Sequence, residues 1–111
     1  MSGTRLRDGS VRWPRLRRVR ANLRVVIALR NGDKCQARVL DVSTGGMHLE
    51  SERVPEYGEP VTVVVRLEDS DDWHLISATV RWVGRKRFGV AFDALDSRQA
   101  DALAEFVGRA A

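Results

Sequence analysis

The stretch Asp41-Val-Ser-Thr-Gly-Gly46 places a carboxylate, a hydroxyl and two glycines in one short segment between two apolar runs. Asp and Ser side chains hydrogen-bond to nearby backbone, and glycine adopts positive φ without steric cost, so we expect a tight turn. The same groups can bind a polar ligand. Asp41 supplies an acceptor, Ser43 supplies a hydroxyl, and Gly45 and Gly46 leave the backbone open to close approach.

An arginine-rich segment ends shortly before this turn. Residues 1–20 contain seven arginines and one acid, Asp8, whereas the rest of the chain contains 12 basic and 14 acidic side chains. This distribution predicts a nearly neutral body with a basic arm, which favours an anionic partner such as a nucleotide, a nucleic acid or a membrane surface. Arginine offers a planar fork for bidentate contacts to phosphate or guanine. The candidate ligand-binding arginines are Arg15, Arg17, Arg18 and Arg20.

No set of residues has the spacing of a catalytic or metal site. His48 and His74 lie far apart in strand-like positions, so a structural or surface role is favoured for each. Cys35 has no nearby histidine and is predicted to be an inert thiol. Ser43 lacks both a nucleophile-elbow context and an evident base. We therefore predict that the protein is not an enzyme, with no catalytic residue, no metal and no cofactor.

The length of 111 residues predicts a single domain. No apolar run approaches the roughly 18–20 residues of a membrane helix, and the basic N-terminus lacks the apolar run of a secretory signal. Cytoplasm is the predicted location. The large apolar rings of Trp73 and Trp82 favour buried positions for these two residues. Trp13 neighbours the arginines and could stack on a base.

Alternating apolar residues between turn signals predict six strands. Asn31-Gly32 predicts a two-residue type I′ turn between the first two of them. Six short strands with tight turns indicate a small antiparallel barrel. The predicted strands are Leu23–Arg30, Lys34–Val42, Met47–Ser51, Val61–Leu67, Trp73–Val83 and Phe88–Phe92.

The last part of the chain changes to a helical period. Asp96 or Ser97 can cap a helix, and Gln99 completes a variant of the capping box. One apolar stripe along residues 96–110 should lie against the sheet. The expected class is all-β with one terminal helix. The chain divides into a flexible basic tail (1–10) and one domain (11–111), which comprises an arginine-rich arm (11–22), a barrel (23–93) and the helix.

An arginine cluster, a hairpin, the Asp41-x-Ser43-x-x-Gly46 turn, strands ending in Phe88-Gly-Val-Ala-Phe92 and a final helix follow one another in this chain. This order resembles the PilZ domain family over about residues 11–108. The resemblance implies a six-stranded barrel that binds the bacterial second messenger cyclic di-GMP. It also implies that binding uses an Arg-x-x-x-Arg element in an N-terminal switch arm together with an Asp/Asn-x-Ser-x-x-Gly turn.

The turn motif is present in full, but the arginine motif departs from the family pattern. In the family's register Arg18 is the second arginine, and Pro14 stands in place of the first; the literal spacing occurs at Arg20 and Arg24. The resemblance therefore implies either a cyclic di-GMP receptor that signals by ordering its arm to a downstream protein partner, or a degenerate adaptor that acts by protein contact without nucleotide. Non-specific nucleic-acid binding through the arm ranks last, because 6% aromatic residues provide few stacking platforms.

Overall fold

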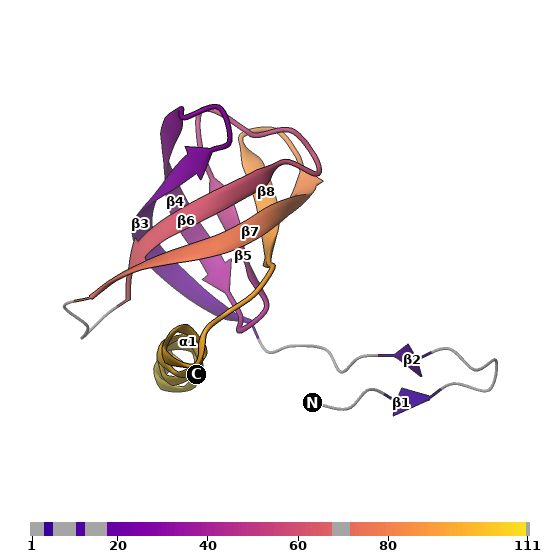
Figure 1. Ribbon diagram of the computed structural model, residues 1–111, viewed down its shortest axis with the longest axis vertical. Coiled ribbons are helices and arrows are strands. Elements are labelled where there is room, and N and C mark those ends of the chain that lie inside the picture. Colours follow the sequence, from indigo (N-terminus) through magenta and orange to yellow (C-terminus); the bar gives the residue numbers. More distant parts are fainter. Residues whose placement is uncertain (1–3, 6–10, 13–17, 68–71, 111) are drawn as a thin grey trace.

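Six strands, in which inward apolar side chains alternate with outward ones except at bulges, close into a barrel. The computed structural model describes residues 4–5, 11–12, 18–67 and 72–110. The barrel strands run antiparallel in the order β3-β4-β5-β8-β7-β6 (Figure 1). Their bounds are β3 Val19–Leu29, β4 Lys34–Val42, β5 Gly46–Glu50, β6 Pro60–Arg66, β7 Trp73–Val83 and β8 Arg87–Phe92. The predicted six-stranded antiparallel barrel with one C-terminal helix is confirmed.

The inward face of every barrel strand contributes to one core. The fully buried side chains are mostly branched aliphatic, which suits the pleated surface of a sheet. They include Ile27, Val39, Leu49, Val63, Ile76 and Phe88, each 0% exposed. Because a closed barrel has no free strand edge, the molecule presents its side chains, and not unpaired backbone, to partners around the barrel wall.

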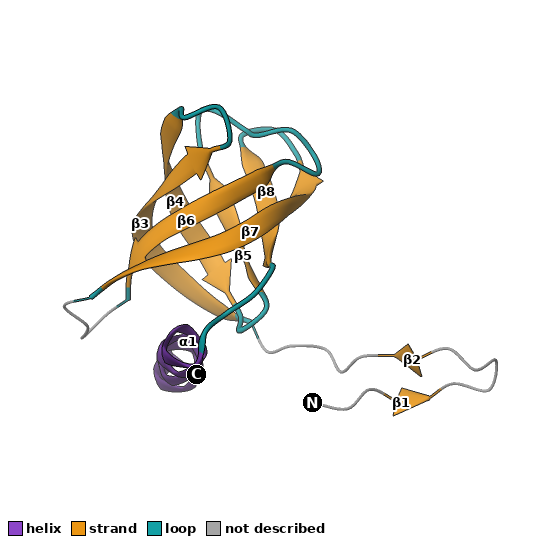
Figure 2. Ribbon diagram, in the orientation of Figure 1, coloured by secondary structure: helices purple, strands orange, loops and turns teal. Residues whose placement is uncertain are grey.

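Helix α1 (Ser97–Ala110) covers one end of the barrel (Figures 1 and 2). The predicted capping box is present at its start: Gln99 N–H donates to Asp96 Oδ1 at 2.7 Å, and Asp96 N–H donates to Gln99 Oε1 at 3.2 Å. Leu103 and Val107 are buried in the core, as the apolar stripe predicted. The helix therefore closes the barrel end at which β3 begins.

The predicted type I′ turn at Asn31-Gly32 is wrong. Leu29 and Asp33 close the hairpin, because Leu29 N–H donates to the carbonyl of Asp33 at 2.7 Å, so the loop has three residues. Type I′ requires positive φ at both central positions, and here Gly32 has φ 92° whereas Asn31 does not have positive φ. Asn31 Oδ1 instead accepts from Asp33 N–H at 2.9 Å. This side-chain bond stabilises the longer loop.

Strand β3 begins at Val19, four residues before the predicted start at Leu23. Val19 and Arg20 pair with Val42 and Asp41, and a bulge separates this pairing from the regular register that resumes at Leu23. The bulge hid this part of the strand, because bulges interrupt the alternation on which strand prediction depends. Part of the predicted arm is therefore barrel strand. Its role as a switch stays a prediction.

The N-terminal residues that the structure describes form a separate two-stranded pair. Strand β1 (Thr4–Arg5) pairs antiparallel with β2 (Val11–Arg12). Strand β1 lies in the predicted tail (1–10) and β2 in the predicted arm (11–22). Trp13, which could stack on a base, and Pro14, which stands in place of the first arginine of the family motif, lie outside the described residues.

The predicted burial of Trp73 and Trp82 is wrong, since these side chains are 60% and 48% exposed. For Trp73 the strand parity already indicated an outward position, because its neighbours His74 and Ile76 face the core. For Trp82 a bulge between Val80 and Trp82 reverses the alternation. Both rings are thus available on the outside of the barrel.

The burial of the Cys35 side chain on β4 can be tested through the reactivity of its thiol. Its side chain packs against the core, and desolvation raises the pKa of its thiol above the ordinary value. Because the thiolate is the nucleophile, a raised pKa leaves less reactive species at pH 8. We expect Cys35 to react with Ellman's reagent several-fold more slowly in the folded chain than in guanidinium. Equal rates would contradict the burial of this thiol.

Candidate functional site

The Asp41–Gly46 turn is fixed by its own hydrogen bonds. Ser43 N–H donates to the carbonyl of Gly46 at 2.9 Å, and Gly45 N–H donates to Ser43 Oγ at 3.1 Å. The carbonyl of Gly45 accepts from Phe92 N–H at 2.9 Å, which ties the turn to β8. Ser43 is 1% exposed, so its hydroxyl first serves the turn itself.

Gly46 is needed for the close packing of two strands and not for positive φ. Neither Gly45 nor Gly46 has positive φ. Instead, a Cβ on Gly46 would lie 2.2 Å from the carbonyl oxygen of Val90, a contact that real structures exclude. The missing side chain allows β5 to approach β8 closely. The turn is therefore held in register at the edge of the site.

The carboxylate of Asp41 holds two neighbouring side chains. Its Oδ1 accepts from Arg18 Nη1 at 2.6 Å, and its Oδ2 lies 3.0 Å from His48 Nδ1. The Arg18 and His48 side chains are 43% and 40% exposed, whereas that of Asp41 is 26% exposed. The less exposed acid thus orients two groups that remain accessible from solvent.

His48 continues the site towards β7. Gly89 pairs with His48 on one side and with Trp82 on the other. A Cβ on Gly89 would lie 3.0 Å from His48 Cδ2, so this glycine leaves room for the rings. The His48 and Trp82 rings meet edge to face, with centroids 5.8 Å apart and planes at 67°. A continuous polar and aromatic row therefore crosses the outer wall from Arg18 to Trp82.

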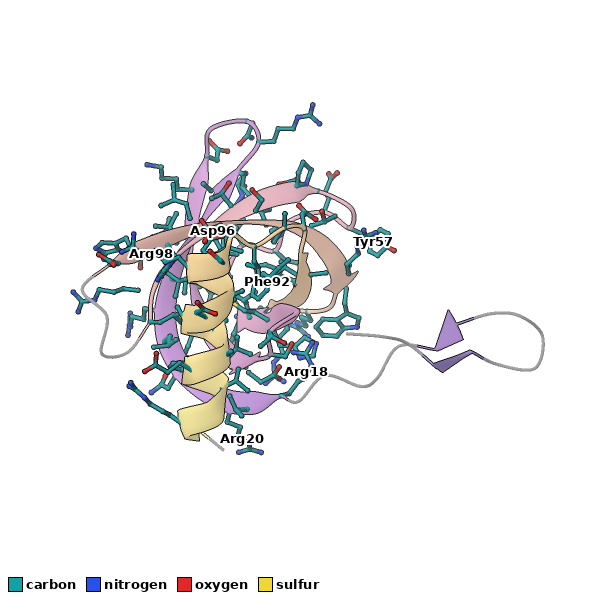
Figure 3. The ribbon with its side chains drawn as sticks, turned by 60° about the horizontal axis from the view of Figure 1, so that its bottom comes forward. Arg18, Arg20, Tyr57, Phe92, Asp96 and Arg98 are labelled. Atoms are coloured by element: carbon teal, nitrogen blue, oxygen red, sulfur yellow. The ribbon has the colours of Figure 1, made fainter. Side chains whose placement is uncertain are left out.

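These residues surround an open groove of about 680 Å³. Four predicted site residues line it, namely Arg18, Ser43, Gly45 and Gly46. Asp41 contacts the groove through its bonds to Arg18 and His48. Arg20 does not line it, and Figure 3 shows this side chain at the lower edge of the molecule, away from Arg18. Arg15 and Arg17 lie outside the described residues.

Sequence reasoning missed four residues that line the groove: His48, Arg81, Trp82 and Gly89. For His48 a signal was present, because it lies two residues beyond Gly46 and therefore on the same face of β5. No such signal existed for Trp82, because the bulge beside it cannot be read from alternation. The role of Gly89 in the groove could not be predicted, because it follows only from the pairing of Gly89 with His48 and Trp82 on neighbouring strands.

The part of the chain that the structure describes contains neither a cluster of metal ligands nor a helix suited to span a membrane. No group of three or more His, Cys, Asp or Glu side chains in these residues can hold a metal ion. In the same residues no helix is long and apolar enough to cross a membrane.

Comparison with known proteins identifies what this architecture is similar to. A family model described as the PilZ domain matches residues 11–109. No curated protein gives a significant match.

Solved structures share the fold. The inhibitor of motility MotI/DgrA of Bacillus subtilis superposes with a TM-score of 0.74 at 17% identity, covering 94% of this chain and 55% of its own. The PilZ domain of CeSA from a cellulose-synthesizing bacterium gives 0.70 at 18%, covering 84% and 96%. The PilZ domain of YcgR from Escherichia coli with c-di-GMP gives 0.69 at 15%, covering 87% and 90%. The chain thus spans about half the length of MotI/DgrA. At these identities the likeness establishes the fold alone.

Proposed function

Because the chain belongs to the PilZ domain family, we propose that it is a receptor for cyclic di-GMP, bound in the groove between Arg18 and Trp82. PilZ domains are generally non-catalytic receptors or adaptors, and the family binds this nucleotide. The observation that carries the proposal is the bridging carboxylate of Asp41, which holds Arg18 at the edge of a groove with an exposed tryptophan on its far side.

The chemistry of the groove suits a guanine dinucleotide. Arg18 and Arg81 bring positive charge to a ligand with two phosphates, and an arginine fork can pair with guanine O6 and N7 or clamp a phosphate. The half-exposed face of Trp82 offers a surface on which a base can stack. Asp41 can accept from guanine N–H groups once a ligand displaces part of its present pairing. A phosphate, a guanine edge and a base face therefore each have a candidate partner in or beside the groove.

The arm completes the proposed site and carries the signal. Arg15 and Arg17 supplement Arg18 when the ligand is bound, and the arm orders over the nucleotide. Such an ordered arm would present a new surface to a downstream protein partner. In this proposal the protein is a cytoplasmic, non-catalytic receptor.

Isothermal titration calorimetry of the full chain with cyclic di-GMP tests this function. We expect saturable heat at micromolar ligand that weakens as salt rises, because phosphate contacts contribute to binding. Titration with GMP serves as the control, since it lacks the second guanine and the cyclic backbone. If no heat of binding is observed at high micromolar cyclic di-GMP, the receptor proposal is wrong.

Trp82→Ala should weaken cyclic di-GMP binding by about 1–3 kcal/mol, the range for loss of one base-stacking contact. Trp82→Phe keeps an aromatic face and should retain most of the affinity. Trp73→Ala is the matched control, because Trp73 is also exposed on β7 but does not line this groove. The measurement is the dissociation constant by calorimetry. Equal losses for Trp82→Ala and Trp73→Ala would contradict a stacking role.

A degenerate adaptor without nucleotide is the second candidate function. Pro14 stands where the family places the first arginine, and Arg18 already has a carboxylate partner without ligand. Such an exposed pair is worth about 0–1 kcal/mol, so it does not prevent a ligand from recruiting Arg18. A nucleotide-indifferent protein partner, combined with silent calorimetry, would favour this candidate.

A further inference from the structure

His48 lines the groove but stands outside the sequence motif of the turn. A bulge between β4 and β5 sets what lies opposite it. Val39 pairs with Leu49. In a regular antiparallel ladder the next residue, Leu40, would therefore lie opposite His48. The register shift places Asp41 there instead, so the barrel departs from regular pairing at the point where it brings this carboxylate and this imidazole together.

The contact with Asp41 determines which nitrogen of the His48 ring carries hydrogen. Nδ1 of His48 lies 3.0 Å from Asp41 Oδ2. An ionised carboxylate can only accept hydrogen bonds, so Nδ1 is the donor. In the neutral imidazole the other nitrogen, Nε2, then bears a lone pair and accepts. Asp41 is itself held by Arg18, whose Nη1 donates to Asp41 Oδ1 at 2.6 Å, and the carboxylate therefore presents His48 with a fixed acceptor.

The Nε2 atom of His48 is open to a ligand. The side chain is 40% exposed, and Nε2 has no hydrogen-bond partner among the residues that the structure describes. Its edge of the ring lies beside Gly89, because a Cβ built on Gly89 would stand 3.0 Å from His48 Cδ2 and 3.4 Å from Nε2. Gly89 also lines the groove. The absence of a side chain at Gly89 therefore leaves this edge of the imidazole uncovered.

A base that stacks on Trp82 lies beside this acceptor. The centroids of the His48 and Trp82 rings are 5.8 Å apart, and their planes are inclined at 67°. A base parallel to the indole is inclined to the imidazole by the same angle, so it cannot stack on His48 and contacts it through a hydrogen bond. Guanine carries donors at N1 and at its 2-amino group, and acceptors at O6 and N7. The acceptor Nε2 complements the donor edge, whereas the arginines of the groove complement the acceptor edge.

We propose that His48 is a specificity-determining residue of the nucleotide site, and that its Nε2 accepts a hydrogen bond from the N1–H or the 2-amino group of guanine. This inference rests on the proposed function, because it assigns a role within the cyclic di-GMP groove. A neutral Nε2 has no hydrogen to donate, so His48 does not serve a phosphate oxygen. Adenine in the same place binds less well, because its N1 bears a lone pair and its ring lacks the 2-amino group.

Calorimetry with cyclic di-GMP at pH 8 compares the wild type with three variants of His48. His48→Gln offers an amide N–H to Asp41 and a carbonyl oxygen to the base, so it should bind within about threefold of the wild type. His48→Leu lacks an acceptor and should bind about tenfold more weakly. His48→Lys can only donate, so it should also bind more weakly, although its added charge favours an anionic ligand. Glu50→Leu is the control, because Glu50 is the next outward residue of β5 and does not line this groove.

Discrimination between bases separates recognition from packing. The wild type should bind cyclic di-AMP at least about tenfold more weakly than cyclic di-GMP, and His48→Leu should narrow this ratio, because it loses a bond that only guanine makes. An imidazole that only packs against Trp82 would give equal losses for the two nucleotides, and that result would overturn the proposal. A His48→Lys protein that binds cyclic di-GMP as tightly as the wild type would also overturn it.

Nuclear magnetic resonance of the nucleotide-free chain tests the tautomer by itself. The chain has two histidines, so the spectrum of His48→Gln assigns the ring nitrogens of His48. We expect hydrogen on Nδ1 in the free chain and a changed Nε2 chemical shift when cyclic di-GMP saturates the site. Hydrogen on Nε2, or an Nε2 signal that does not respond to the nucleotide, would contradict the role of His48. If the wild type gives no heat with cyclic di-GMP, the proposed function is wrong and this role with it; if the wild type and all His48 variants bind equally, only this inference is wrong.

Discussion

Gly46→Ala is expected to lower the free energy of unfolding by about 3 kcal/mol, at the upper end of the range for overpacked cores. The added Cβ would lie 2.2 Å from the carbonyl oxygen of Val90. That oxygen belongs to backbone, so no side-chain rotation can relieve the overlap. Relief requires β5 to move away from β8, and Gly46 pairs with Ala91 in the register that joins these strands.

Chemical denaturation of the variant and of Gly108→Ala measures this effect. Gly108 lies in α1, is exposed, and has open space where an added Cβ would stand, so its replacement should be neutral or stabilising by about 0.5–1 kcal/mol. A matched pair of glycine substitutions with opposite signs would separate steric overlap from the general effect of adding a methyl group. A Gly46→Ala variant as stable as the wild type would show that β5 and β8 do not approach this closely at Val90.

The same substitution connects the fold to the site. Ser43 N–H donates to the Gly46 carbonyl, and Asp41 precedes the turn on β4. A shift of β5 would move His48, whose ring contacts both Asp41 and Trp82. Any Gly46→Ala protein that still folds should therefore lose cyclic di-GMP affinity as well. The contact with Val90 explains the motif glycine by strand packing, and calorimetry on the variant tests whether ligand binding depends on that packing.

The barrel could be predicted because its strands obey alternation. Inward residues such as Ile76 and Val80 recur at every second position of β7. The start of the helix could be predicted from the Asp96–Gln99 capping box. The hairpin at Asn31-Gly32 was mispredicted because the dipeptide does not encode loop length; Leu29, and not Arg30, closes the loop with Asp33. Local chemistry therefore indicated a turn, but cross-strand register determined its type.

The candidate site could be predicted only in part, for the same reason. Asp41 and Ser43 stand in a recognisable motif, and Arg18, one of the four candidate arginines, donates to Asp41. Trp82 was assigned to the core because of its size, and the inward position of Val80 would place position 82 on the same side by parity. A bulge reverses that parity. Bulges are features of strand pairing, so a single sequence read by period cannot reveal them.

Arg18→Ala is expected to weaken cyclic di-GMP binding by about 2–3 kcal/mol, roughly 30- to 150-fold, as for other losses of hydrogen bonds to a charged group. Arg18 is the arginine that both lines the groove and pairs with the motif acid. Arg53→Ala is the matched control, because Arg53 is also an exposed arginine paired with an aspartate, at 2.9 Å from Asp33, but lies outside the groove. Calorimetry should show little change for Arg53→Ala. Equal affinities for the two variants would remove Arg18 from the proposed site.

A double-mutant cycle with Asp41→Asn decides how Arg18 acts. If Asp41 orients Arg18 towards the ligand, removing its charge should weaken binding, and this loss should shrink when Arg18 is already alanine. If the ion pair instead competes with the ligand for Arg18, Asp41→Asn should strengthen binding in the presence of Arg18. We expect the first result, because the pair is exposed and worth only about 0–1 kcal/mol, whereas the 2.6 Å contact fixes the direction of a long side chain. Additive losses would show that the two residues contact the nucleotide independently.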